Sequence, residues 1–436
     1  MSDIINIGLL GLGTVGRGVW QLVSRDSEII ANRLGARLKI KKILVRDPSK
    51  ERGMDIPADI LTADARDILD DDDIRIVAEV IGGTDIARLL VDKALAAGKS
   101  VVTANKELMA DYGQEVLTAA EQNGVDLMFE ASVGAGIPII HPLKESLVGN
   151  RIQRVMGIVN GTTNFILSKM DAGQGYAEAL AEAQALGYAE RDPANDIEGK
   201  DAAAKIAILA SIAFNSRVRA ADVFTEGIAG ITPLDIMYAR ELGYAVKLLA
   251  VAKCDAPTGR VEPELDVRVH PAMIPLSHPL AAVKDAYNAI FVEGDAVGEL
   301  MFFGQGAGSL PTASAVVADL FMAADNLSKS IRGRLGCTCF NSWAIKPIDQ
   351  VESSFYLLIE ATDKPGVLAK IAKVFGDQEV SLSSVIQKRT HEGIAEVVFM
   401  TQKVKEGNLR AALAKLAALD IIAGVRNAIR VEGGQE

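Results

Sequence analysis

A glycine-rich turn near the start of the chain constrains the fold most strongly. The apolar run "IINIGLL" is predicted to be a buried strand. The motif "GLGTVG", Gly11 to Gly16, follows it and opens a predicted helix at about Thr14. Glycines allow a tight turn and the close approach of a pyrophosphate, and the first N–H groups of a helix attract negative charge. In this strand–turn–helix context the motif predicts dinucleotide binding rather than a merely tight turn.

The residues after this motif alternate strand-like and helical segments. The predicted strands are "LKIKKILV", "IRIVAEVIGG", "KSVVTANK" and "VDLMFEASVG", and "IARLLVDKALAAG" is a predicted helix that ends at Gly98. Strands that alternate with helices favour parallel βαβ units. We therefore predict an α/β fold in which residues 1–135 form a Rossmann-type dinucleotide-binding domain, completed by a returning segment at about 304–340.

The remainder of the chain is predicted to form two further domains. Residues 136–310 mix helices, at 174–187 and 200–214, with strand-like runs, and we expect an α+β catalytic and dimerisation domain there. From Ser354 onward the pattern changes to the order βαββαβ, which is typical of a ferredoxin-like domain, here placed at 354–434.

Composition and charge argue against several classes of function. A net charge of -11 without a basic stripe, and an aromatic content of 5%, disfavour a nucleic-acid partner. No apolar stretch has membrane-spanning length, and no basic region precedes the first strand. Cys254, Cys337 and Cys339 form no even disulfide framework, so we interpret them as free thiols. We expect a cytoplasmic protein that acts on a small molecule, without nucleic-acid or membrane partners.

Two basic residues follow strands of the predicted Rossmann-type sheet. Arg46, just before Asp47 in "ILVRDPSK", favours NADP(H), because a base there pairs a 2′-phosphate whereas an acid binds the ribose of NAD(H). NAD(H) is the alternative cofactor. The alternative interpretation of Arg46 is a solvated loop residue that binds no cofactor. Lys106 in "TANK" comes just past a parallel strand, at the edge where ligands bind, so it can face both nicotinamide and substrate. The alternative is a surface lysine.

The segment "GYAERDPANDIEGKDAAAK" places five carboxylates directly before an apolar helix. Asp201 and Lys205 are four residues apart and share one face of that helix, which Ile208 continues. A buried lysine must be paired or functional, and Asp201 supplies a partner. The upstream acids then suit the cationic group of a small ligand. An ordinary surface pair would not explain them, so the segment predicts an active site.

Two further glycine-rich turns admit more than one interpretation. "FEASVGAGIP" contains one acid, Glu130, and can turn several carbonyl groups inward, which suits a hard cation. Taken alone, this pattern favours a domain hinge. "FFGQGAGSLPTASAVVADL" runs into a helix and either returns to the cofactor site or is a simple helix N-terminus.

Together these motifs resemble the homoserine dehydrogenase family. The resemblance rests on Gly11–Gly16, "TANK", "EASVGAG", GxGAGxxPTAS and above all AxxxGYAExDPxxDIxGxDxxxK, and it covers about Ile5 to Asn341. The tail resembles an ACT domain. The resemblance implies reversible NAD(P)-dependent reduction of L-aspartate 4-semialdehyde to L-homoserine, in threonine, methionine and isoleucine biosynthesis. We expect L-threonine to act through the ACT domain, with a pure assembly module as the alternative.

The resemblance also implies roles for individual residues. Lys205 would give and take the proton, Lys106 would lie between cofactor and substrate, and Glu190 and Asp201 would bind substrate, with Asp196 as a secondary candidate. A monovalent cation, usually sodium, would be held by Glu130 and the backbone oxygens of Val133, Ala135 and Ile137. The expected cofactor contacts are Gly11, Leu12, Gly13, Thr14, Val15, Gly16, Arg46, Lys106 and Gly304. Asp363 and Gly366 would hold the effector, and the assembly would be a homodimer or homotetramer.

Two other functions compete with this prediction. An aldehyde dehydrogenase of the semialdehyde type needs a nucleophilic cysteine in its catalytic domain. Cys254 lies in an apolar run without a nearby histidine, and Cys337 and Cys339 lie in the connector before the tail. A cofactor-bound amino-acid sensor without turnover would not need the complete set of acids and lysine.

Overall fold

The structure is a computed structural model that describes residues 4–255, 262–331, 333 and 336–433. The chain divides into two compact units. Unit 1 comprises Met1–Val155, Ala204–Ala221 and Asn288–Ser342, and unit 2 comprises Met156–Ala203, Asp222–Tyr287 and Trp343–Glu436. Within the described ranges, the helices are all too short or too polar to cross a lipid bilayer.

Unit 1 contains a six-stranded parallel sheet. Its strands are β1 (Ile4–Leu10), β2 (Arg37–Leu44), β3 (Leu61–Thr62), β4 (Ile74–Glu79), β5 (Ser100–Thr103) and β6 (Leu127–Met128). The spatial order is β3-β2-β1-β4-β5-β6, and each neighbouring pair is parallel. The order reverses between β1 and β4, which is the point where dinucleotides bind in Rossmann-type folds. The predicted N-terminal fold is therefore confirmed.

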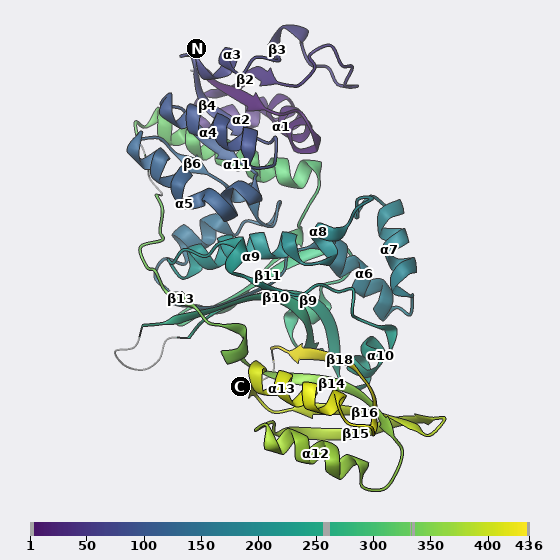
Figure 1. Cartoon of the computed structure of the whole chain (residues 1–436). Helices are drawn as coiled ribbons and strands as arrows, with labels where there is room; N and C mark the ends of the chain where they lie inside the picture. Colours follow the sequence, from purple (N-terminus) through teal and green to yellow (C-terminus); the bar gives the residue numbers. More distant parts are fainter. Residues whose placement is uncertain (1–3, 256–261, 332, 334–335, 434–436) are drawn as a thin grey trace. The chain divides into compact units, whose positions relative to one another are not determined.

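The sheet is accompanied by helices from the same segment and by one that returns later in the chain. The former are α1 (Thr14–Arg25), α2 (Ser27–Leu34), α3 (Arg66–Leu69), α4 (Asp85–Ala96) and α5 (Lys106–Gln122) (Figure 1). The returning helix α11 (Ser309–Ser328) buries Ala313, Val316 and Leu320 in the same apolar core as Ile7 and Val19. This spacing of three to four residues is that of a helix with one core-facing side.

The last predicted strand of this series is shorter than expected. Only Leu127–Met128 of "VDLMFEASVG" pairs with β5, because the chain turns at once into the 3-10 helix Glu130–Ser132. The Ser132 hydroxyl donates a hydrogen bond to the Phe129 carbonyl oxygen at 2.6 Å and supports this turn. The π-helix Pro142–Ser146 and the strands β7 (Ile152–Ile158), β11 (Tyr287–Gly294) and β12 (Gly298–Gln305) follow, and β7 continues into unit 2.

Unit 2 combines a helical part with two long strands. Its helices are α6 (Gly161–Asp171), α7 (Tyr176–Ala185), α8 (Ala194–Ile197) and α10 (Pro233–Glu241), while α9 (Lys200–Ala213) begins here and continues into unit 1. β9 (Tyr244–Asp255) and β10 (Glu264–Pro275) form an antiparallel pair, which β8 (Phe224–Thr225) and β13 (Ala344–Ile345) extend. β9 and β10 are buried along most of their length; β9 therefore lacks the alternation that identifies a half-exposed strand, whereas β10 shows it only from Leu265 to His270.

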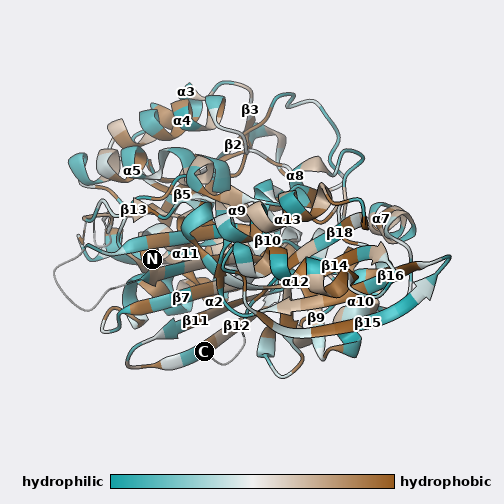
Figure 2. Cartoon of the chain, turned by 60° about the horizontal axis from the view of Figure 1, so that its bottom comes forward, coloured by the Kyte–Doolittle hydropathy of each residue, from teal (hydrophilic) through white to brown (hydrophobic). Residues whose placement is uncertain are grey.

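The C-terminal part of unit 2 has the predicted βαββαβ order. It comprises β14 (Glu352–Thr362), α12 (Val367–Asp377), β15 (Leu382–His391), β16 (Ile394–Thr401), β17 (Val404–Lys405), α13 (Glu406–Ala417) and β18 (Ile422–Val431). Both helices pack on the antiparallel sheet β18-β14-β16-β15 (Figure 1). The edge strand β15 is largely exposed and hydrophilic at its free end, which discourages pairing with other chains (Figure 2).

Backbone pairing and buried charge tie this C-terminal domain to the rest of unit 2. β18 pairs in parallel with β10 at Ala272–Arg430 and Met273–Val431. The Arg268 guanidinium, which is fully buried, donates to Glu432 at 2.6 Å and to the Ser353 hydroxyl at 3.0 Å. The α/β fold class with a Rossmann-type start and a ferredoxin-like end is confirmed, and the predicted domain limits stay predictions.

Candidate functional site

The six residues of the glycine-rich motif form the turn between β1 and α1. Gly11 has φ of 103°, a left-handed conformation that favours glycine. A Cβ on Gly16 would lie 2.3 Å from the Gly11 carbonyl oxygen, so a side chain there would force the turn apart. Gly13, the N-cap of α1, has open space where its Cβ would be. The turn therefore leaves room for an anion at the helix N-terminus.

Arg46 and Asp47 follow β2, next to this turn. Their side chains differ in their hydrogen-bond partners. The Asp47 carboxylate accepts hydrogen bonds from the Ser49 N–H at 2.9 Å and the Ser49 hydroxyl at 2.6 Å. The Arg46 side chain is exposed, and among the described residues it makes no hydrogen bond or ion pair. The basic side chain is thus available to a ligand, whereas the acid is held in its own turn.

A buried acid lies at the ends of β4 and β5, shortly before Lys106 in the fold. Glu79 is fully buried, accepts a hydrogen bond from the Thr103 hydroxyl at 2.6 Å, and accepts one from the Ile81 N–H at 2.7 Å. The half-buried Lys106 opens α5 just beyond. Sequence reasoning missed Glu79, although an acid closing the apolar run "IRIVAE" is a recognisable signal.

Two of the predicted acids are joined by one buried amide. The Asn160 side chain, which follows β7, donates to Asp196 Oδ1 at 2.7 Å and to Asp201 Oδ2 at 2.8 Å. Its oxygen accepts from the Thr163 N–H at 2.9 Å and so caps α6. Asn160 and Asp201 are each 5% exposed. We call Asn160, Asp196 and Asp201 the acid cluster; sequence reasoning missed Asn160, whose signal is an asparagine between an apolar strand and a helix.

Lys205 lies one helical turn beyond Asp201 on α9 and is 9% exposed. The other side chains of this helix, from Ala202 to Ala213, are buried as well, so Lys205 lies on a buried helix. Glu190 is different, because it is exposed in the loop after α7. Its backbone oxygen accepts from Gln184 Nε2 at 3.1 Å, but within the described ranges no hydrogen bond joins its carboxylate to the acid cluster.

The predicted cation ligand Glu130 is buried and bonded to the backbone. Its carboxylate accepts hydrogen bonds from the backbone N–H groups of Ile139 at 2.5 Å, Ile140 at 2.8 Å and His141 at 2.8 Å. His141 Nε2 lies 2.8 Å from Asp319 Oδ1 and 3.7 Å from Glu130 Oε2. Burial disfavours a charge on His141, but the hydrogen bond and charge of Asp319, together with Glu130, raise the pKa of His141 to about 9. An imidazolium therefore already neutralises part of this acidic site.

The backbone groups expected to complete the cation site lie in a tight turn. Val133, Ala135 and Ile137 are buried, and Ala135 has φ of 47°, a left-handed value that is unusual for alanine. Gly304 lies against this turn, since a Cβ there would be 3.2 Å from Ile137. Among the described residues no group of three or more His, Cys, Asp or Glu suits a metal, so a cation would depend on these carbonyl oxygens.

The two predicted effector residues lie in the loop between β14 and α12. The Asp363 carboxylate accepts from the Thr390 hydroxyl at 3.1 Å, and its backbone N–H donates to the Gly393 carbonyl oxygen at 2.8 Å. Gly366 is the N-cap of α12 with φ of 85°. Both residues are exposed, so a small ligand has access to this helix N-terminus.

Comparison with known proteins agrees with this geometry. A family model described as homoserine dehydrogenase matches residues 138–321, one described as the NAD binding domain of homoserine dehydrogenase matches 11–130, and an ACT domain model matches 355–420. The homoserine dehydrogenase of Synechocystis sp. is 44% identical over 433 residues, which cover 98% of this chain and 99% of the relative. The chain belongs to the homoserine dehydrogenase family. It is an oxidoreductase that acts on a CH–OH group, with a nicotinamide cofactor and a C-terminal ACT domain.

Solved structures extend the agreement over the full chain. A homoserine dehydrogenase from Thiobacillus denitrificans has a TM-score of 0.92 and 42% identity, and the match covers 99% of this chain and 100% of that one. A hyperthermophilic archaeal homoserine dehydrogenase in complex with NADPH has a TM-score of 0.61 and 29% identity, over 73% of this chain and 97% of that one. The predicted family and enzyme class are confirmed, and the roles of individual site residues stay predictions.

His141 should give stability a specific pH dependence. The pKa of His141 is about 9 in the folded state, against an unperturbed value of 6.5. Its contribution to the free energy of unfolding is therefore complete below pH 6.5 and disappears as the pH rises through 9. We expect His141→Gln to lower the free energy of unfolding by up to about 3 kcal/mol at pH 6, with a much smaller loss at pH 9. Urea denaturation across this range measures the difference. His391→Gln, at an exposed position, is the control; a pH-independent loss in His141→Gln would contradict the account.

Proposed function

We propose that the chain catalyses the reversible reduction of L-aspartate 4-semialdehyde to L-homoserine with NADP(H), in the biosynthesis of threonine, methionine and isoleucine. The acid cluster, followed by Lys205 one turn later on the buried helix α9, supports this proposal most directly. A zwitterionic substrate needs carboxylates for its ammonium group, and a lysine suits an oxygen that gains charge during the reaction.

The acid cluster would bind the substrate ammonium group. Asn160 provides its two amide hydrogens to Asp196 and Asp201, so one donor group holds two like charges together. Repulsion between the carboxylates makes a bound cation favourable, because the ammonium neutralises both. Glu190, in its exposed loop, would join the acid cluster when substrate binds, since binding loops often close on their ligands.

Lys205 would protonate the substrate oxygen on reduction and deprotonate the hydroxyl group on oxidation. A bound nicotinamide supplies the hydride chemistry. A largely buried ammonium group interacts strongly with a developing alkoxide, because little water screens it. Lys106, at the start of α5, would contact both nicotinamide and substrate.

Arg46 would select NADP(H) by pairing the 2′-phosphate. Its exposed guanidinium lies beside the turn that receives the pyrophosphate, while Asp47 is engaged by Ser49. The cofactor contacts would come from Gly11 to Gly16, Arg46, Lys106 and Gly304. The archaeal relative whose structure contains NADPH supports the same choice.

We also propose a monovalent cation, sodium by preference, at Glu130 and the carbonyl oxygens of Val133, Ala135 and Ile137. The left-handed turn at Ala135 and the buried carboxylate favour this site. Because the His141 imidazolium already faces Glu130 and Asp319, a cation of low charge fits better than a divalent one.

The proposed assembly is a homodimer or homotetramer, and the exposed side chains of Met301 and Phe303 on β12 offer apolar surface for it.

Regulation by L-threonine would act through the ACT domain, with Asp363 holding the ammonium group and the N-terminus of α12 at Gly366 holding the carboxylate. Unit 2 contains a continuous set of contacts from that domain to the acid cluster. Arg430 of β18 donates to Glu226 at 2.7 Å, and nearby the Ile228 N–H donates to the Ile197 carbonyl oxygen at 2.9 Å. Ile197 ends α8, which carries Asp196. An effector that prefers one arrangement of β18 would thereby bias the position of Asp196.

Replacing Lys205 tests the chemical step. We expect Lys205→Ala to lower kcat by about 100-fold or more while NADP+ binding is retained, because the ammonium acts mainly in the transition state. Steady-state kinetics and a fluorescence titration of NADPH separate the two effects. Lys200→Ala is the matched control, at an exposed residue on the same helix, and should retain activity. Near-normal kcat in Lys205→Ala would refute the proposed role.

Replacing Arg46 tests the choice of cofactor. We expect Arg46→Ala to raise the KM for NADP+ by a factor that corresponds to ~1.5–3 kcal/mol, with little change for NAD+, because only NADP+ carries the 2′-phosphate. Lys39→Ala, at an exposed position earlier on β2, serves as the control. Equal effects on both cofactors would count against the assignment.

Point variants test threonine regulation better than deletion of the ACT domain. Deletion would remove Glu432 and leave the buried Arg268 with Asp266, at 3.3 Å, as its ionic partner; breaking a buried ion pair costs ~3–5 kcal/mol in comparable cases. We expect Asp363→Ala to raise the threonine concentration for half-inhibition by about tenfold or more at unchanged uninhibited kcat, because one charged contact is lost. Asp377→Ala, at the exposed end of α12, is the control. Unchanged inhibition in Asp363→Ala would place threonine elsewhere, and a threonine-insensitive wild type would favour a pure assembly role.

A further inference from the structure

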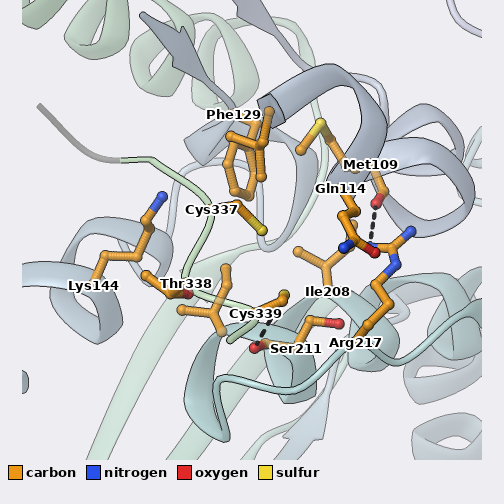
Figure 3. A pocket seen from close by; sticks show the side chains of 13 residues that line it. Met109, Gln114, Phe129, Lys144, Ile208, Ser211, Arg217, Cys337, Thr338 and Cys339 are labelled. Carbon is orange, nitrogen blue, oxygen red and sulfur yellow. Dashed lines mark hydrogen bonds between the residues drawn. The ribbon is translucent and has the colours of Figure 1, made fainter. Parts of the chain in front are cut away.

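A pocket in unit 1 is lined by two thiols and two cationic side chains. Met109, Phe129 and Ile208 form part of its apolar wall, and Lys144 and Arg217 line it as well. The segment Cys337–Thr338–Cys339, here called the dithiol segment, closes another side. Figure 3 shows both sulfur atoms turned toward this pocket, with Lys144 and Arg217 on opposite sides of it. Nothing in the proposed reaction uses these groups.

The dithiol segment is fixed by contacts from several elements. The Cys337 N–H donates to Glu121 Oε1 of α5 at 2.6 Å, and Lys144 Nζ donates to the Gly336 carbonyl oxygen at 3.0 Å. Beyond the segment, the Asn341 N–H donates to the Asn215 carbonyl oxygen at 2.9 Å. The Phe340 N–H donates to the Thr338 carbonyl oxygen at 2.9 Å, which makes a tight turn around Cys339. The two thiols are thus held close together rather than on a loose surface loop.

The two thiols differ in acidity because they are hydrogen-bonded to each other. Cys339 donates its S–H to Cys337, and this bond lowers the pKa of Cys337 to about 6 and raises that of Cys339. The Cys339 sulfur also lies 3.8 Å from the Ser211 carbonyl oxygen, an alternative acceptor for the same proton. Near neutral pH, Cys337 is therefore a thiolate beside a protonated thiol, which is the arrangement of an attacking and a resolving cysteine. Burial raises the pKa of Cys254 to about 11, so that thiol is unreactive by comparison.

We propose that Cys337 and Cys339, which are both partly exposed, are a redox-active pair that exchanges with a low-molecular-weight disulfide. The Cys337 sulfur attacks one sulfur of the disulfide, forms a mixed disulfide and releases the first small thiolate. Cys339 then loses its proton and attacks the Cys337 sulfur, which closes an intramolecular disulfide and releases the second thiolate. The protein dithiol is oxidised by two electrons, the small disulfide is reduced to two thiols, and solvent exchanges the protons.

The side chains beside the two thiols have chemical features that suit such a disulfide. Lys144 and Arg217 offer positive charge to the carboxylates of a peptide-like disulfide, and Phe129 and Ile208 offer apolar surface to its carbon chain. A disulfide between cysteines two residues apart closes a very short loop, so it gains little stability and is easily reduced. Those are properties of a reversible switch rather than of a structural bridge.

Oxidation would affect the helix that carries Lys205. Ile208, Ser211 and Ile212 of α9 line the pocket, and Ser211 faces the Cys339 thiol. Lys205 lies one turn before Ile208 on the same helix. A disulfide withdraws the Cys339 proton from this contact and shifts the segment against α9. Misplacement of a catalytic group by about 1 Å can cost ~100-fold in rate, so turnover should respond.

The test treats the reduced full-length enzyme with glutathione disulfide, and then counts thiols in denaturant and measures kcat. We expect free thiols to fall from three to one, the peptide that carries both cysteines to lose two hydrogens, and kcat to fall by ~10-fold or more. Dithiothreitol should restore kcat. Cys339→Ser should trap a mixed disulfide on Cys337, and Cys337→Ser should leave Cys339 unreacted. Cys254→Ser, the matched control, should behave like the wild type.

Three results would overturn the proposal. The first is an unchanged thiol count in the wild type, and the second is oxidation that proceeds equally well in Cys337→Ser. The third, oxidation of the pair with unaltered kcat, would refute the link to α9. Cys339→Ala provides a second variant if Cys339→Ser is poorly folded, and trapping on Cys337 should be the same in both. The rate of iodoacetamide alkylation of Cys337 should rise with a midpoint near pH 6, which is an independent check on the thiolate.

Discussion

One buried amide group, that of Asn160, organises the acid cluster on which the proposed function depends. Two neighbouring carboxylates repel each other unless hydrogen-bond donors lie between them. The amide supplies a hydrogen to each, at 2.7 and 2.8 Å. Because Asn160 also caps α6, the ends of β7, α6, α8 and α9 are fixed through a single side chain. The cluster therefore has a stable geometry, and it would offer carboxylate oxygens to a substrate ammonium group.

The same region explains how a distant domain can influence the proposed chemistry. The ACT domain shares backbone pairing with β10 and contributes Glu432 to a buried ionic cluster, so it is part of the fold of unit 2 rather than a flexible appendage. Arg430 and Glu226 join β18 to the segment that contacts the end of α8. Under the proposed regulation, Asp196 would be the member of the acid cluster that a change at β18 affects most. The proposed oxidation of the dithiol segment would affect Lys205 instead, because this segment lies beside α9.

Local patterns allowed much of this to be predicted, and long-range contacts account for what was missed. The turn at Gly11–Gly16, the helix near 200–214 and the βαββαβ tail depend on residues close in sequence, and the structure agrees with them. The partners of Asn160, and the contact of His141 with Asp319, join residues far apart in sequence, so spacing alone cannot show them. β9 escaped prediction because burial on both faces removes the alternation of a strand. β10 alternates only from Leu265 to His270, and sequence reasoning missed that short pattern.

The most direct test of the central claim is the KM for L-homoserine in Asn160→Ser. Serine retains an oxygen that can cap α6 but removes the amide hydrogens that hold Asp196 and Asp201. We predict a KM for L-homoserine at least about tenfold higher, with unchanged binding of NADPH, because a lost charged contact costs more than 1.4 kcal/mol. For 4-hydroxybutanoate, which lacks the amino group, the wild type and Asn160→Ser should have the same KM. An unchanged KM for L-homoserine, or an equal loss with both substrates, would show that the acid cluster does not bind the ammonium group.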